Sequence, residues 1–175
     1  MSAVEVGTAF AVPIPAEKPV WVDRGMDDIR TISMEHEWTG EKLNVPYWER
    51  GHMLIDALAE IDHFLRDSRN GKVHATDPAV LDILVAMRRH LGTEAPIHVV
   101  CGYRSPETNA MLAEQSDGVA KHSFHMEGMA IDIRIPGRDL SAMRAVALDL
   151  QAGGVGYYPR SNFLHVDSGP VRSWS

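Results

Sequence analysis

The succession of strand-like and helix-like segments constrains the fold of this chain more than any other feature of its sequence. Residues 29–37 and 42–48 alternate apolar and polar side chains around a Thr-Gly pair, which predicts a β-hairpin. Helical spacing of apolar residues follows over 53–67, and an N-cap aspartate before a proline predicts a second helix from Asp77. Further strands are predicted at 97–101, 130–135, 153–158 and 162–167, and further helices from Ser105 and over 140–150. Because no regular strand–helix–strand repeat emerges, we predict an α+β fold with an antiparallel sheet and flanking helices.

Length and composition indicate one globular domain. The 175 residues suffice for a single core, and residues 1–26 are predicted to form a poorly structured arm, since the first 22 are rich in Ala, Val and Pro without a period. The formal net charge of −7 argues against a nucleic-acid surface, and no apolar run is long enough to span a bilayer. A single cysteine, Cys101, excludes multi-cysteine zinc sites, so histidines and carboxylates remain as metal ligands.

One segment, residues 121–132, concentrates side chains that can bind a metal or move a proton. Catalytic zinc takes three protein ligands, imidazole nitrogen and carboxylate oxygen among them, and keeps a fourth position open. His125 and Asp132 can converge, because Gly128 permits a tight approach between them. His165, inside an apolar strand, is the best candidate for a third ligand. From spacing alone, capping or turn roles for the first two and a hydrogen-bonded core role for His165 remain open.

The pattern Ser123-x-His125-x-x-Gly128-x-Ala130-x-Asp132 resembles the zinc-binding signature of the D-alanyl-D-alanine peptidase and hedgehog-like metallopeptidase superfamily. Within that superfamily the chain resembles the murein endopeptidase branch, on the segments 63–67, 102–109, 153–160 and 165–172. The similarity extends from about Ile29 to the C-terminus. It implies one zinc peptidase domain over 27–175 with the hedgehog-like peptidase fold. It also implies Zn²⁺ ligation by His125, Asp132 and His165.

The resemblance also implies an activity. We expect a zinc-dependent endopeptidase that hydrolyses amide bonds in murein cross-links containing meso-diaminopimelate, so that its partners are peptidoglycan peptide stems. That substrate places the protein in the periplasm or cell envelope, and we expect a monomer. Two alternatives stay open: a noncatalytic, metal-stabilised module that binds the cell wall, and a D,D- or L,D-carboxypeptidase that trims stem peptides.

The residue that accepts a proton during catalysis is not fixed by the resemblance. The positions where relatives carry a base hold Asn162 and Phe163 here. Asp167 is the preferred replacement, because strand residues two apart project from the same face as His165. Asp167 can act as the base or can instead orient His165.

Other side chains are candidates for substrate binding. The resemblance implies that Arg104 holds the substrate, and a guanidinium fork can grip a carboxylate or polarise the scissile carbonyl; a structural ion pair is the alternative. Tyr157 and Tyr158 can line a substrate groove or stabilise an oxyanion, although one of them can equally pack in the core. His122 is a candidate for substrate binding and, together with Glu127, for the base. Four other histidines lack ligand spacing and are predicted at the surface: His36, His52, His74 and His90.

Overall fold

The described part of the chain, residues 29–115, 120 and 122–175 of a computed structural model, contains both helices and strands. The predicted arm over residues 1–26 lies outside these residues. The elements are β1 (Ile29–His36), β2 (Lys42–Glu49), β3 (His52–Met53), α1 (Ile55–Phe64), α2 (Pro78–His90), β4 (Ile97–Cys101), α3 (Pro106–Gln115), the 3-10 helix η1 (Phe124–Glu127), β5 (Ala130–Arg134), α4 (Leu140–Asp149), β6 (Gly154–Tyr158), β7 (Phe163–Asp167) and β8 (Arg172–Trp174). The predicted α+β class is confirmed.

All of the described strands belong to one sheet, in the order β3-β2-β1-β4-β5-β7-β6-β8. Most neighbours are antiparallel, but β1 pairs with β4 and β6 pairs with β8 in parallel. The sheet is therefore mixed, and the prediction of an antiparallel sheet was wrong for these two pairings. Parallel neighbours need a long crossover connection, and the chain between β1 and β4 supplies one that includes α1 and α2.

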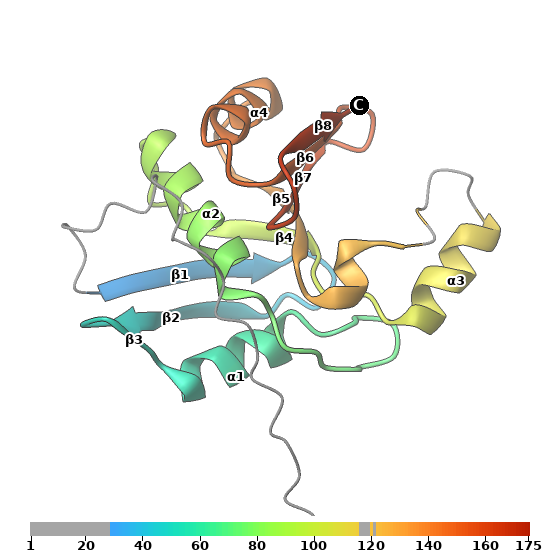
Figure 1. Cartoon of the computed structure of the whole chain (residues 1–175), viewed down its shortest axis with the longest axis horizontal. Helices are drawn as coiled ribbons and strands as arrows, with labels where there is room; N and C mark the ends of the chain where they lie inside the picture. The colour runs from blue at the N-terminus through green and yellow to red at the C-terminus, as the bar shows by residue number, and fades with distance from the viewer. Residues whose placement is uncertain (1–28, 116–119, 121) are drawn as a thin grey trace, which may run out of the picture.

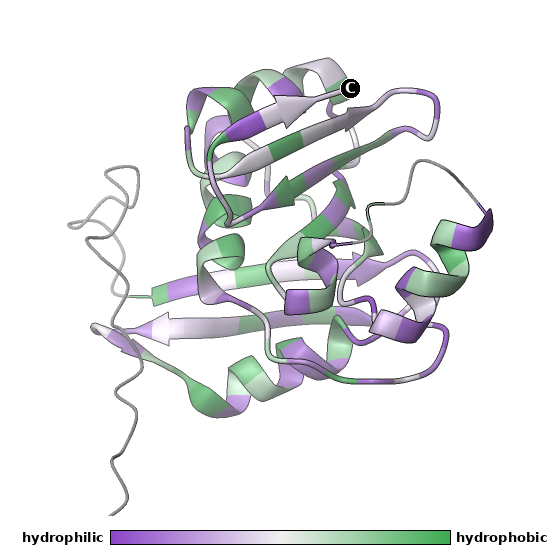
Figure 2. Cartoon of the chain, turned by 45° about the vertical axis from the view of Figure 1, so that its right-hand side comes forward, coloured by the Kyte–Doolittle hydropathy of each residue, from purple (hydrophilic) through white to green (hydrophobic). Residues whose placement is uncertain are grey.

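Within the described residues, a single core lies between one face of the sheet and the helices α1, α2 and α4 (Figure 1). Along β5 and β7, every second side chain enters this core, as Ile133 and Leu164 do with no exposed surface. The helices carry both apolar and polar colour, as expected for elements that cover a sheet with one side (Figure 2). Asp77 caps α2 by accepting a hydrogen bond from the backbone N–H of Ala79, as its position before Pro78 predicts. None of the described helices is long and apolar enough to cross a membrane.

One surface prediction was wrong. His36 is only 1% exposed and packs edge-on against Phe64 of α1, with ring centroids 5.8 Å apart. Burial, which opposes a charged ring, lowers the pKa of His36. His52, His74 and His90 are exposed, as predicted.

Candidate metal site

Three donor atoms meet on the face of the sheet opposite α1, α2 and α4. Nε2 of His125 lies 3.2 Å from Oδ1 of Asp132 and 3.1 Å from Nδ1 of His165. Nδ1 of His165 lies 2.9 Å from the same Asp132 oxygen. Asp132 and His165 are directly paired across β5 and β7, so their side chains project side by side. The structure thus brings together the three side chains that were predicted to bind a metal.

The short helix η1 delivers His125 to this point. Ser123 caps η1, and its hydroxyl accepts a hydrogen bond from the His125 backbone N–H. Gly128 ends η1 in the left-handed region, with φ of 67°. A side chain at Gly128 would also collide with the Ala75 carbonyl. Glycine is therefore required here both for the backbone turn and for the close approach of the 68–77 loop.

Hydrogen bonds on the far side of each imidazole fix its tautomer. Nδ1 of His125 lies 2.8 Å from the Gly102 carbonyl oxygen, which can only accept, so this nitrogen carries the proton. Nε2 of His165 lies 3.0 Å from Oδ2 of Asp167 and donates to that carboxylate. In the neutral rings, Nε2 of His125 and Nδ1 of His165 are then unprotonated, and their lone pairs face Asp132. Three acceptors that face one another in this way can share a cation, either a proton or a metal ion.

The arrangement fits a zinc ion. Zn–N and Zn–O bonds of about 2.0–2.1 Å place tetrahedral ligand atoms roughly 3.3 Å apart, close to the separations of 2.9–3.2 Å found here. The electrostatics agree with this fit. Burial alone would lower the pKa of His125, but Asp132 and Cys101 raise it well above its ordinary value. Burial would raise the pKa of Asp132, but both histidines together outweigh burial and hold that pKa well below its ordinary value. The site therefore favours positive charge.

A fourth potential donor lies beside the three. Between Val99 and Cys101 the β4–β5 pairing shifts register, so that Cys101 opposes Asp132. This irregularity brings the thiol onto the face that carries the site. Ligand atoms of Cys101, His125 and Asp132 all lie within 4.8 Å of one another. The thiol is partly buried, and no role as a ligand was predicted for it.

Asp167 turns away from the three converging atoms. Its side chain has no exposed surface, and its carboxylate accepts hydrogen bonds from His165 Nε2, from Arg172 and from the backbone N–H groups of Gly154 and Gly169. Burial would raise the pKa of Asp167, but the bonds from His165 and Arg172 hold it well below its ordinary value. These contacts place the carboxylate behind His165 and support the orienting alternative over the role of base.

Arg104 lies beside His125. The backbone N–H of Arg104 donates to the His125 carbonyl oxygen over 3.1 Å, and Nη2 donates to the Ser123 hydroxyl over 3.1 Å. The Nε–H group is buried and has no hydrogen-bond partner within the described residues. Two hydrogen bonds hold the turn that carries Arg104. The Asp67 carboxylate accepts one from the Ser105 N–H, and the Leu65 backbone carbonyl accepts the other from the Tyr103 N–H. The guanidinium is thus held in place, and its Nε–H can still donate a hydrogen bond.

The other residues that were predicted to contact the substrate lie in different places relative to the site. Tyr157 pairs with Leu164, faces the helices and lies under the Arg144 guanidinium, so the structure does not bring it to the site. Tyr158 is on the site's face, where it stacks on Phe163 and accepts a hydrogen bond from Trp174 Nε1. His122 and Glu127 are exposed in the segments before and within η1.

Two contributors were missed from the sequence. The Gly102 carbonyl fixes the His125 tautomer, and a backbone oxygen leaves no signal in residue types. Arg172, which binds Asp167 with both terminal nitrogens, lies inside a segment that carried the resemblance, but no role was predicted for it. A signal did exist: a conspicuous His-x-Asp pair on one strand face, followed five residues later by arginine.

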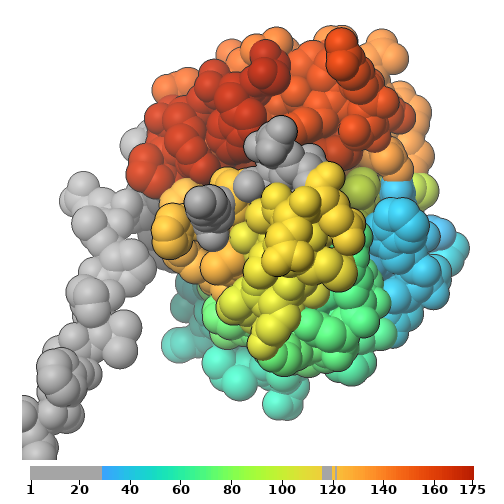
Figure 3. All heavy atoms as spheres, turned by 90° about the vertical axis from the view of Figure 1, so that its right-hand side faces the viewer, coloured from blue at the N-terminus to red at the C-terminus, as the bar shows by residue number. Residues whose placement is uncertain are grey.

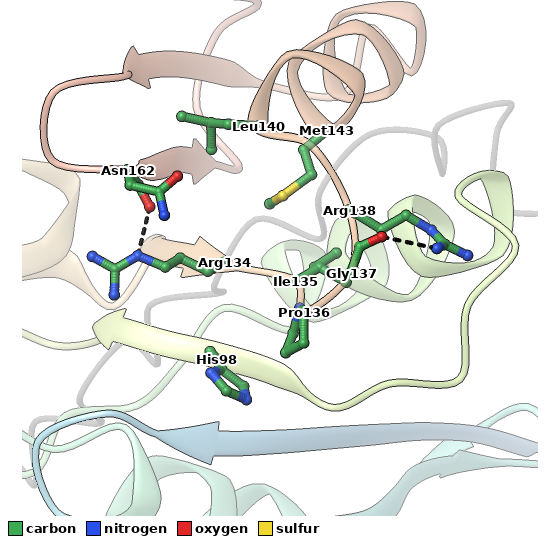
Figure 4. Close-up of a pocket in the computed structure, with 9 residues that line it drawn as sticks. All are labelled: His98, Arg134, Ile135, Pro136, Gly137, Arg138, Leu140, Met143 and Asn162. Atoms are coloured by element: carbon green, nitrogen blue, oxygen red, sulfur yellow. Dashed lines mark hydrogen bonds between the residues drawn. The ribbon is translucent and has the colours of Figure 1, made fainter.

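The surface around the site is formed by segments that are distant in sequence. In the space-filling view, the C-terminal strands border the segment of η1 (Figure 3), and Arg172 of β8 lies over the Phe124 ring there. A separate pocket of about 320 Å³ lies at the far end of β5 (Figure 4). Its arginines already have protein partners: Arg134 bonds to the Asn162 carbonyl and Glu37, and Arg138 to the carbonyls of Leu91 and Gly92. The guanidinium groups of both arginines are thus already bonded to other parts of the protein.

Comparisons with known proteins identify the class. A family model described as peptidoglycan L,D-endopeptidase MepK matches residues 24–174. The chain therefore belongs to a peptidase family, and that family is the one of MepK.

Individual relatives agree with the family model along most of their length. The chain is 40% identical over 174 residues to the peptidoglycan L,D-endopeptidase MepK of Escherichia coli. The matched segment covers 99% of this chain and 93% of that protein. The MepK of Shigella flexneri gives the same values. The probable peptidoglycan L,D-endopeptidase MepK of Haemophilus influenzae is 44% identical over 146 residues, covering 83% of this chain and 78% of that protein.

Proposed function

We propose that this protein is a zinc-dependent peptidoglycan endopeptidase whose metal is held by His125, Asp132 and His165. The observation that carries the proposal is the convergence of two imidazole lone pairs and a carboxylate oxygen, with each imidazole proton bonded on the far side. Two histidines and one carboxylate form a ligand set typical of catalytic zinc. When bound, the ion supplies Lewis-acid chemistry, which polarises a carbonyl and acidifies a water.

The substrate follows from the relatives and from Arg104. The relatives are named L,D-endopeptidases of peptidoglycan, and we assign this chain to amide bonds in murein cross-links that contain meso-diaminopimelate. Arg104 binds a carboxylate of the stem peptide, because its buried Nε–H lacks a partner in the described structure while Nη2 is anchored to Ser123. Tyr158 lines the same face.

Asp167 serves this proposal as a positioning group. Its carboxylate holds Nε2–H of His165 and thereby keeps Nδ1 free for the metal. The proton that leaves the attacking water then needs another acceptor. His122 and Glu127, both exposed and both in the segment around His125, are the candidates.

The proposal includes the setting of the enzyme. Residues 27–175 form one monomeric peptidase domain of the hedgehog-like type, which acts on peptide stems in the periplasm or cell envelope. Support comes from the family match over residues 24–174 and from the single core of the described residues.

A second function deserves a test because of Cys101. With a thiol near His125 and Asp132, four donors are available, and zinc sites with four protein ligands are structural. In that case the chain is a noncatalytic module that binds the cell wall and keeps zinc for stability.

The deciding experiment uses purified muropeptides and mass spectrometry. Zinc-loaded protein, a chelated sample and a His125→Ala variant are incubated with cross-linked muropeptides, and Cys101→Ser serves as the fourth sample. We expect the zinc-loaded protein and Cys101→Ser to cleave the cross-links. The chelated sample and His125→Ala should not cleave them. No cleavage by any sample, with zinc still bound by the wild type, would refute the enzyme and favour the binding module. Release of terminal D-Ala alone would indicate a carboxypeptidase.

A further inference from the structure

Arg172 binds the carboxylate behind His165 in a two-pronged geometry. Nη1 donates to Oδ1 of Asp167 over 3.0 Å and Nη2 donates to Oδ2 over 2.7 Å. The Asp167 side chain has no exposed surface, whereas that of Arg172 is 40% exposed. A bidentate pair of this kind fixes the orientation of the carboxylate, which a single ammonium group does not do.

The guanidinium of Arg172 also contacts two aromatic rings. Its carbon atom lies 5.1 Å from the centroid of Phe124 and 4.9 Å from that of Trp174. Phe124 directly precedes His125 in η1, and the Trp174 ring lies 5.1 Å from the His165 ring. One side chain of β8 therefore touches the surroundings of both histidines.

Strand β6 leaves room for this cluster because it carries glycines. A β-carbon at Gly154 would overlap with Arg172 and Asp167, and one at Gly156 would lie 2.7 Å from the Trp174 ring. Gly154 and Gly156 are thereby explained by the close approach of β8 side chains to β6, whereas a β-carbon at Gly153 would collide with the Asp167 backbone carbonyl.

We propose that Arg172 is a positioning residue of the metal site: by clamping Asp167 it fixes the Nε2–H tautomer of His165 and keeps Nδ1 directed at the metal. This inference rests on the proposed function, since it takes His165 as a zinc ligand. Arginine acts here through Asp167 and touches neither substrate nor metal. Lysine in its place retains the charge but offers only a point contact to the carboxylate.

The test compares Arg172→Gln and Arg172→Lys with Arg134→Gln. Arg134 is a matched control, because it also pairs with a carboxylate, that of Glu37, at the end of β5 away from the site. Two quantities are measured: the His165 tautomer in zinc-free protein by long-range ¹H–¹⁵N NMR, and the zinc dissociation constant by competition with a chromophoric chelator.

We expect wild type and Arg134→Gln to show one His165 tautomer with the proton on Nε2. Arg172→Gln should show a mixture of tautomers and bind zinc about tenfold more weakly, at the lower end of the range known for changes to the hydrogen-bond partners of metal ligands. Arg172→Lys should fall between them. Circular dichroism checks folding, and Arg172→Lys decides the matter if Arg172→Gln does not fold.

A single Nε2–H tautomer and unchanged zinc affinity in the folded Arg172 variants would overturn the inference. A wild type that binds no zinc would instead defeat the proposed function, and it would remove the role in metal binding as well. The tautomer measurement in zinc-free protein separates these two failures, because it does not depend on the metal.

Discussion

Asp67 offers a quantitative test of how the turn that carries Arg104 is held. Its side chain is 2% exposed and accepts hydrogen bonds of 2.9 Å from the backbone N–H groups of Arg69 and Ser105. In Asp67→Asn one of these oxygens becomes an NH₂ group, which cannot accept. One buried N–H then loses its partner and the other loses a charged acceptor, for a total cost of about 2–4 kcal/mol.

The assay is urea unfolding at neutral pH. With a denaturant slope of about 2 kcal/mol/M, the midpoint of Asp67→Asn should fall by roughly 1–2 M. Asp149→Asn is the control, because Asp149 is exposed at the end of α4, and its midpoint should match the wild type.

The same pair of proteins tests the sign of the pH dependence. Burial would raise the pKa of Asp67, but hydrogen bonds from Thr108, Arg69 and Ser105 lower it overall. Because the folded pKa is below the unfolded value of about 3.9, the stabilisation is complete above that pH and is lost as the pH falls through the folded pKa. The gap between wild type and Asp67→Asn should therefore be full at pH 7 and shrink below about pH 4. A gap that stays constant down to pH 3, or is absent at pH 7, refutes the reasoning.

Three further outcomes are expected. Arg104→Ala should raise KM for muropeptides at least about tenfold with unchanged zinc affinity, since the lost contact is to the substrate; equal loss of zinc binding would argue for a structural role. Gly128→Ala should lower the urea midpoint more than Gly71→Ala, because both glycines have positive φ but only Gly128 lacks space for a β-carbon; equal losses would contradict the contact with Ala75. Zinc at about 1,000 times its dissociation constant should add about 4 kcal/mol to the free energy of unfolding, and His165→Ala should abolish that gain; a gain that persists in the variant would exclude His165 as a ligand.

Local signals in the sequence were enough for most of the secondary structure. The Asp77-Pro78 pair marked the start of α2, and the apolar run that begins at Ala130 marked β5 within one residue of its end. The two- and three-residue strands β3 and β8 were not predicted, because such short segments have no period of their own and exist through pairing with β2 and β6. The parallel pairing of β1 with β4 also depends on where the chain returns, which residue types do not encode.

The candidate site was predictable in composition but not in orientation. Residue chemistry and resemblance together selected His125, Asp132 and His165, and the structure brings their donor atoms within 3.2 Å of one another. The alternation of strand faces placed Asp167 correctly beside His165. It did not reveal on which side of the imidazole the carboxylate lies, because that depends on the side-chain torsions and on Arg172. Burial of His36 was missed for a similar reason, since it depends on the packing of α1.

The pairing of Asp132 with His165 has a consequence for the kinetics of folding. These residues are 33 positions apart, and β1 joins β4 across a still longer separation. Contacts between distant segments form slowly, so we expect the donor set to assemble only after the central strands have paired. A ligand that binds a set completed late stabilises the native state more than the transition state. We therefore expect zinc to slow unfolding while it leaves the refolding rate nearly unchanged. Bound zinc would then lengthen the lifetime of the folded state.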